Sequence, residues 1–217
     1  LLNIIASVRD ITRFREAEEI KSTFISVISH ELKTPVALIK GYVSTLRRED
    51  ASWDREIVAD SLKVIEEEAD RLTTLIENLL DASRLQAGGI KINLSDVDLK
   101  TLAARVAQRF ETQTSQHQIV VDFPTGFPII TGDEERLMQV FSNLISNAIK
   151  YSPSGGEIHI NAQFRADHVI VCVTDQGTGV APEDIPHIFD RFYRSQGATR
   201  TTKGAGLGLS LARAVIE

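Results

Sequence analysis

A heptad seam in residues 53–85 constrains the fold more than any other feature of the sequence. Apolar residues there recur with spacings of 4, 3, 4, 3, 4 and 3, at Val58, Leu62, Ile65, Ala69, Leu72, Ile76 and Leu79. This period places the side chains on one stripe of an α-helix, and such a stripe is stable only when other helices cover it. The sequence AGG at residues 87–89 ends the predicted helix.

We predict that residues 11–47 form a second helix, antiparallel to this one. A second apolar stripe comprises Ile25, Ile28, Leu32, Val36, Ile39, Val43 and Leu46. Its period continues past Pro35, so we expect a bend there and not a stop. Two long antiparallel helices cannot cover both stripes alone, which predicts a homodimer that closes a four-helix bundle.

His30 lies in the stretch SVISHELKTP, on the polar side of the first helix. Thr34 follows one turn later, so the two side chains share an exposed face. The carboxylate of Glu31 follows the imidazole directly in the sequence. On this stretch alone, a solvated surface histidine is the default interpretation.

Composition excludes several classes of protein. The net charge of −6 over 217 residues, without a cluster of basic residues, argues against a nucleic-acid partner. No apolar run reaches about 18 residues, the length that spans a membrane. Cys172, in the apolar run HVIVCVTD, is expected to be a small core residue. The chain begins without methionine, which indicates a piece of something longer.

The second half, from about Ile90, alternates between strand and helix patterns. Strands are expected at IKINLSDVDL and QIVVDFP, and helices over residues 100–110 and 133–151. EIHINAQF and HVIVCVTD alternate as a strand pair. We therefore expect a mixed α/β layered domain.

Three motifs in this half suggest chemistry. NLISNAIKYS places Asn143 and Asn147 on one helix face, with Lys150 and Tyr151 on the next turn, although a satisfied polar face explains this pattern equally well. Asp175 ends a strand before the glycines of DQGTGV, Gly177 and Gly179. The last motif is GAGLGLSLARAVIE, in which Gly204, Gly206 and Gly208 precede a helix whose free N–H groups favour phosphate. It matches neither the dinucleotide fingerprint nor the P-loop.

Together, SHELKTP, NLISNAIKYS, DQGTGV, IFDRFYR and GAGLGLSLARAVIE resemble, in order and spacing, the sensor histidine kinases of two-component systems. The resemblance covers the chain from about Ile11 onward and rests on five ordered motifs. It implies an α and α+β protein, with a dimerising helical hairpin and an α/β sandwich ATP-binding domain of the GHKL, or Bergerat, type. Residues 1–10 resemble the end of a PAS-type sensor domain, 11–24 a connecting helix, 25–88 the phosphotransfer hairpin and 89–217 a C-terminally incomplete ATP-binding domain.

The resemblance also implies roles for single residues. His30 is the phosphoacceptor, Glu31 handles the proton on its other ring nitrogen, and Thr34 orients the water that dephosphorylates the regulator. Asn147 coordinates Mg²⁺ with help from Asn143. The implied contacts of ATP are then Lys150 on phosphate, Tyr151 at the pocket border, Asp175 on the adenine amino group, Gly177 and Gly179 beside the base, Phe189 and Phe192 as anchors of a lid, Arg194 or second Arg191 on the terminal phosphate, and Gly204, Gly206 and Gly208.

The implied activity is ATP-dependent phosphorylation of His30 and transfer to an aspartate of a response-regulator receiver domain. It requires a hinge near residues 87–89 and a cytoplasmic location, with any membrane contact made by missing upstream parts. Two alternatives remain: another ATPase of the same nucleotide fold, and a docking module that mainly removes phosphate from a regulator. Mg²⁺-dependent nucleotide binding separates the docking module from the kinase.

Overall fold

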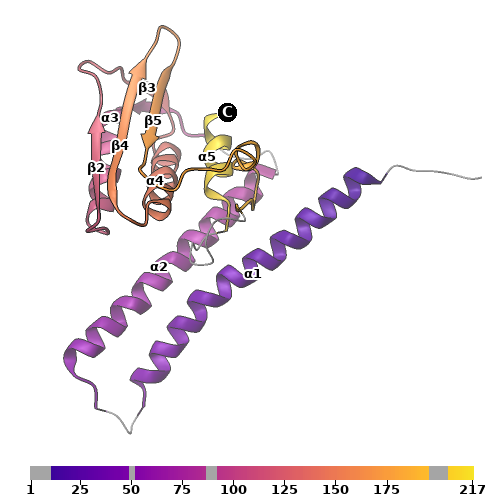
Figure 1. Ribbon diagram of the computed structural model, residues 1–217, viewed down its shortest axis with the longest axis vertical. Helices are drawn as coiled ribbons and strands as arrows, with labels where there is room; N and C mark the ends of the chain where they lie inside the picture. Colours follow the sequence, from indigo (N-terminus) through magenta and orange to yellow (C-terminus); the bar gives the residue numbers. More distant parts are fainter. Residues whose placement is uncertain (1–10, 49–51, 87–91, 196–204) are drawn as a thin grey trace, which may run out of the picture. The chain divides into compact units, whose positions relative to one another are not determined.

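The computed structural model describes residues 11–48, 52–86, 92–195 and 205–217 (Figure 1). The chain divides into two compact units, Leu1–Leu75 and Ile76–Glu217. The expected upstream strand in residues 1–10 and the expected hinge at 87–89 lie outside the described residues.

The first unit consists of two long helices. Helix α1 spans Thr12–Leu46, and helix α2 spans Arg55–Gln86, which begins in the first unit and ends in the second. As predicted, α1 continues through Pro35, whose side chain is among the most deeply buried in the protein. Arg71 of α2 contacts Glu31 of α1, so the two helices lie side by side in this unit.

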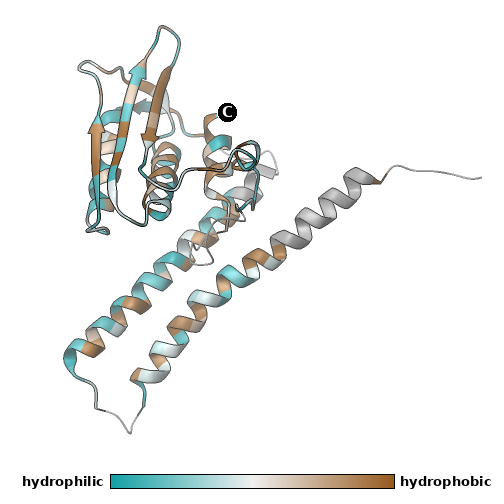
Figure 2. Cartoon of the chain, viewed as in Figure 1, coloured by the Kyte–Doolittle hydropathy of each residue, from teal (hydrophilic) through white to brown (hydrophobic). Residues whose placement is uncertain are grey.

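Hydrophobic residues recur along α1 and α2, as the brown segments in Figure 2 show. Several of their side chains stay exposed in the single chain. Ile25 and Leu62 are each 54% exposed, and Val36 is 49% exposed. The predicted stripes are therefore present, but one copy of the hairpin does not cover them.

The second unit contains a three-stranded sheet of order β2-β4-β5. Strand β2 (His117–Asp122) runs parallel to β4 (Gly156–Phe164), and β4 runs antiparallel to β5 (Val169–Thr174), which confirms the predicted strand pair. A second, two-stranded sheet pairs β1 (Ser95–Val97) with β3 (Ile130–Gly132). The motifs did not predict β3, because three residues are too few to show a period.

Three helices accompany these sheets: α3 (Leu99–Glu111), α4 (Glu134–Tyr151) and α5 (Gly208–Ile216). Asp98 and Asp133 cap α3 and α4, because their carboxylates accept backbone N–H groups of the first turn. A short 3-10 helix, η1, spans Ile185–His187. The apolar core lies between α3, α4 and the three-stranded sheet, with Ile145, Ile158 and Ile160 almost fully buried. The predicted α/β layered domain is confirmed.

Cys172 corrects one prediction, because its side chain is exposed. It pairs with Asn161 across β4 and β5, whereas the core residue Ile160 pairs with Val173 and Ala162 with Val171. Since neighbouring residues of a strand face opposite sides, Cys172 lies on the face away from the core helices. The apolar run HVIVCVTD does not reveal which of its two faces is covered.

None of the described helices has both the length and the apolar composition required to cross a membrane.

Candidate functional site

His30 lies exposed on α1 in the first unit. Within the described residues its imidazole makes no hydrogen bond. The Thr34 hydroxyl donates to the His30 carbonyl oxygen at 3.1 Å, which holds Thr34 one turn away along the helix. The structure therefore brings these two predicted residues together on α1.

Glu31 is buried, with 9% of the residue exposed. Its Oε2 accepts a hydrogen bond from Nη2 of Arg71 at 3.4 Å, and Nη1 of Arg71 lies 3.5 Å from Glu68. The Glu31 carboxylate is thus directed at α2. That Glu31 handles the proton on the His30 ring stays a prediction.

The predicted polar face of α4 lies in the second unit. Asn143 Nδ2 donates to the Gly208 carbonyl oxygen at 3.2 Å, which ties α4 to the first turn of α5. A Cβ at Gly208 would lie 3.3 Å from Asn143 Oδ1, so glycine allows this close approach. Asn147 is half-buried, and its amide has no hydrogen-bond partner within the described residues. Lys150 Nζ lies 4.9 Å from the centroid of the Tyr151 ring.

Asp175 and its glycine neighbours adjoin the end of α4. Asp175 Oδ1 accepts the Gly177 N–H at 2.8 Å, and the Thr178 N–H donates to the Tyr151 carbonyl oxygen at 3.1 Å. A Cβ at Gly177 would overlap that same carbonyl oxygen. Gly179 has a φ of +71° and nothing near its missing Cβ. Gly177 therefore provides space, whereas Gly179 provides a left-handed backbone conformation.

Ser152 is a site residue that the sequence analysis missed. It is only 2% exposed, and its hydroxyl donates to Asp175 Oδ1 at 3.5 Å. Nε2 of His117 lies 2.9 Å from the Ser152 carbonyl oxygen. The only sequence signal was the position of Ser152 directly after Tyr151, at the end of the predicted helix.

Phe192 and Gly206 meet at the two ends of a segment between η1 and α5. The Phe192 N–H donates to the Gly206 carbonyl oxygen at 2.8 Å, and the two residues have φ angles of 66° and 68°. Tyr193 Oη donates to buried Asp184 at 2.6 Å, and hydrogen bonds from Ser195 and Tyr193 lower the pKa of Asp184.

Two predicted cations, one predicted lid anchor and one predicted glycine also belong to the chain between η1 and α5. Arg191 and Arg194 are exposed. Phe189 is 41% exposed, and the guanidinium of Arg213 lies 5.8 Å from its ring centroid. Gly204 lies outside the described residues.

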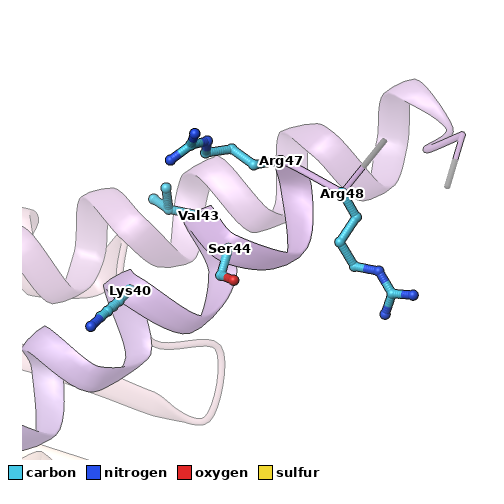
Figure 3. Close-up of a pocket in the computed structure, with 5 residues that line it drawn as sticks. All are labelled: Lys40, Val43, Ser44, Arg47 and Arg48. Carbon is cyan, nitrogen blue, oxygen red and sulfur yellow. The ribbon is translucent and has the colours of Figure 1, made fainter. Parts of the chain in front are cut away.

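A shallow hollow of about 380 Å³ lies elsewhere, near the C-terminal end of α1 (Figure 3). Its lining consists of Lys40, Val43, Ser44, Arg47 and Arg48. None of the predicted site residues is among them. In the described residues, no group of three or more His, Cys, Asp or Glu side chains is arranged to hold a metal ion.

Comparison with protein families gives two matches along the chain. Residues 20–88 match the His Kinase A (phospho-acceptor) domain, and residues 132–217 match the histidine kinase-, DNA gyrase B- and HSP90-like ATPase. The fold is therefore a helical phospho-acceptor region followed by an α/β ATP-binding domain. With these two regions in this order, the chain carries the phospho-acceptor and ATPase domains of a sensor histidine kinase.

A curated relative supports this class. Sensor protein SrrB of Staphylococcus aureus (strain MRSA252) is 32% identical to the chain over 216 residues, which is 99% of the chain and 37% of SrrB. The chain thus spans less than two fifths of the length of this relative.

Three solved structures share the fold. The Acinetobacter baumannii histidine kinase AdeS is 26% identical with a TM-score of 0.64, over 86% of this chain and 85% of that one. Full-length ShkA in complex with AMPPNP is 27% identical with a TM-score of 0.61, over 88% of this chain and 40% of that one. Histidine kinase ThkA in complex with response regulator TrrA has a TM-score of 0.65 at 23% identity, over 98% of this chain and 61% of that one, and this likeness concerns the fold alone.

Proposed function

We propose that this chain is the catalytic core of an ATP-dependent protein-histidine kinase. It phosphorylates its own His30 and passes the phosphoryl group to an aspartate of a response-regulator receiver domain. The observation that carries the proposal is an exposed His30 imidazole in the region matched to the phospho-acceptor family, in one chain with Asn147 and Asp175 of the ATPase-matched region. Exposure suits a nucleophile that two different domains must reach in turn.

The proposed reaction begins with a neutral imidazole. Its unprotonated nitrogen attacks the γ-phosphorus of ATP, the bond to the β–γ bridging oxygen breaks, and ADP leaves with that electron pair. The other ring nitrogen then releases its proton, for which Glu31 is the proposed acceptor. The Glu31 carboxylate accepts a hydrogen bond from Arg71. This role therefore requires the Glu31 side chain to rotate toward His30.

Thr34 is proposed to support a second reaction, the removal of phosphate from a phosphorylated regulator. Its hydroxyl donates to the His30 carbonyl oxygen, and its oxygen lone pairs remain able to accept a hydrogen bond from water. A water held there would lie on the face that carries His30, where the receiver domain is expected to bind. The kinase would then also have phosphatase activity.

ATP is proposed to bind between the end of α4 and the loop after β5. Asp175 would accept the adenine amino group, Gly177 and Gly179 would let the backbone pass beside the base, and Tyr151 would border the pocket. The AMPPNP complex of ShkA, which is 27% identical, supports a nucleotide site in this fold. Lys150 and Arg194 are the proposed phosphate contacts, with Arg191 second. Gly204, Gly206, Gly208 and the lid anchor Phe192 complete the proposed contacts.

The residues present fit a magnesium ion. The Asn147 amide is half-buried without a hydrogen-bond partner in the described part of the chain, and an amide oxygen is a hard ligand of the kind Mg²⁺ takes. Asn143 donates its amide N–H to Gly208, which leaves its carbonyl oxygen for the same face. When bound, the ion would neutralise charge on the phosphates of ATP.

The functional unit is proposed to be a homodimer, in which a second copy covers the apolar stripes of α1 and α2. Leu62→Glu would place a charge in that interface, so it should shift the protein to monomer in light scattering. Ile129→Glu is the matched control, because Ile129 is 67% exposed in the second unit. A dimer that survives Leu62→Glu would refute this interface.

The core is further proposed to work in the cytoplasm, where its substrate ATP is made, and to receive its signal from an upstream PAS-type domain.

The decisive experiment incubates the purified chain with γ-labelled ATP and Mg²⁺, beside His30→Gln and Asn147→Ala variants. We expect acid-labile, base-stable label on the parent and none on either variant, followed by transfer to a receiver domain. A folded, dimeric parent that takes no label would refute the kinase and leave the docking module with phosphatase activity.

A further inference from the structure

The two oxygens of the Asp175 carboxylate have different surroundings. Oδ1 accepts the Gly177 N–H at 2.8 Å and the Ser152 hydroxyl at 3.5 Å. Oδ2 accepts no hydrogen bond from any described residue. Asp175 itself is exposed, so Oδ2 is open to a ligand. Two donors on one oxygen restrict rotation of the carboxylate and leave the other oxygen for recognition.

Ser152 is suited to restrict this rotation because it is almost completely buried. Its hydroxyl has Asp175 as its side-chain partner, and a carboxylate only accepts, so the hydroxyl must donate. A buried hydroxyl without a partner is costly. The hydrogen bond to Asp175 is therefore part of the folded structure and is not an incidental surface contact.

His117 holds the backbone of Ser152. Nε2 lies 2.9 Å from the Ser152 carbonyl oxygen, and a carbonyl only accepts, so Nε2 carries the hydrogen. In the neutral ring Nδ1 is then the acceptor, and it lies 2.8 Å from the Thr114 hydroxyl. The Gly155 N–H donates to the same Ser152 carbonyl at 2.9 Å. The residue that follows α4 is thus fixed from β2 and from its own turn.

We propose that Ser152 is a positioning residue for nucleotide selectivity: it orients Asp175 so that Oδ2 accepts the 6-amino group of adenine, and His117 keeps Ser152 in place. This inference rests on the proposed ATP-binding function. Neither Ser152 nor His117 touches the nucleotide. Their effect should therefore concern the amino group and leave the phosphates and ribose unaffected.

The test compares two nucleotides that differ at one group. Dissociation constants are measured for ATP and for purine riboside 5′-triphosphate, which lacks the 6-amino group, with the parent and Ser152→Ala. We expect Ser152→Ala to weaken ATP binding roughly 3- to 10-fold, the range of one lost hydrogen bond, and to leave the analogue unchanged. Equal weakening of both nucleotides, or no weakening of either, would overturn the proposal.

A second pair of variants guards against misfolding. In His117→Gln the amide nitrogen takes the place of Nε2, so the preference for ATP should persist, whereas His117→Leu should reduce it. The same preference in both variants would contradict the role of His117. A parent that binds neither nucleotide would instead refute the proposed ATP site itself, so the two failures are distinguishable.

Discussion

Gly177 and Gly179 are two residues apart, but the structure gives them different reasons to be glycine. A methyl at 177 would overlap the Tyr151 carbonyl oxygen and would lie 2.8 Å from Asp175 Oδ1. A methyl at 179 would meet nothing within 4 Å, yet the φ of +71° disfavours any L side chain. We therefore predict that Gly177→Ala and Gly179→Ala weaken ATP binding by different amounts and for different reasons.

The magnitude for Gly177→Ala follows from the contacts that must open. Making room for the methyl separates the loop from α4 and breaks two hydrogen bonds, Gly177 N–H to Asp175 and Thr178 N–H to Tyr151. At about 1 kcal/mol each, restoring the native loop for ATP costs about 2 kcal/mol, which weakens ATP binding roughly 30-fold. Gly179→Ala costs only the backbone conformation, about 1 kcal/mol, or roughly fivefold.

Asparagine at both positions gives the sharper contrast. Asn tolerates the left-handed region, so Gly179→Asn should bind ATP nearly as well as the parent. Gly177→Asn carries the same forbidden Cβ as Gly177→Ala and should be at least as weak. Titration calorimetry with ATP and Mg²⁺ measures all four variants, and thermal unfolding shows that each is folded.

The outcome at position 177 decides whether this reasoning is correct. If Gly177→Ala binds ATP as tightly as the parent, the loop yields without loss of the two hydrogen bonds, and the close approach does not support the site. If Gly179→Asn is as weak as Gly177→Ala, backbone conformation does not distinguish the two positions.

Three predictions concern the stability of the second unit. Asp81→Ala should lower the unfolding free energy in urea by about 2 kcal/mol, because Asp81 accepts a hydrogen bond from half-buried Arg136 at 2.6 Å; an unchanged urea midpoint would refute this. Asp133→Ala should cost about 1 kcal/mol at pH 7, because it removes the carboxylate that caps α4. A hydrogen bond from the backbone N–H of Asn93 lowers the pKa of Asp133 from its ordinary value of 3.8. The stability advantage of the parent over this variant is therefore fully present above that ordinary value and should shrink as the pH falls through the folded pKa. A stability difference that stays constant from pH 7 to pH 2.5 would contradict this prediction. Ile145→Ala should cost about 3 kcal/mol, because Ile145 is 0% exposed in the core, and a melting temperature equal to the parent's would refute the assigned packing.

Much of the fold could be predicted because local periodicity is strong in its longest elements. The heptad seam of residues 53–85 predicted α2 to within a few residues of its ends. The helical pattern of residues 11–47 did the same for α1. The helical pattern over residues 133–151 predicted α4 to within one residue of its start, because Asp133 is the residue that caps the helix. Alternation in two neighbouring segments predicted the pairing of β4 with β5.

Other features depend on partners that are distant in sequence. Parallel pairing of β2 with β4 joins segments separated by the whole of α4, and no local pattern encodes it. The exposure of Cys172 depends on which face of the sheet the helices cover. The bond from Asn143 to Gly208 spans 65 residues, so its polar helix face alone did not reveal this partner.

The sequence by itself therefore determined the longer helices and strands, the exposed His30 and the motifs of the class, because these depend on spacing along one helix, strand or loop. Tertiary structure alone decided that Asp175, Ser152 and His117 meet at the end of α4. Each of the three is unremarkable in its own segment. Their hydrogen bonds exist only because packing of the sheet against α4 brings β2, β5 and the helix end within a few ångströms of one another.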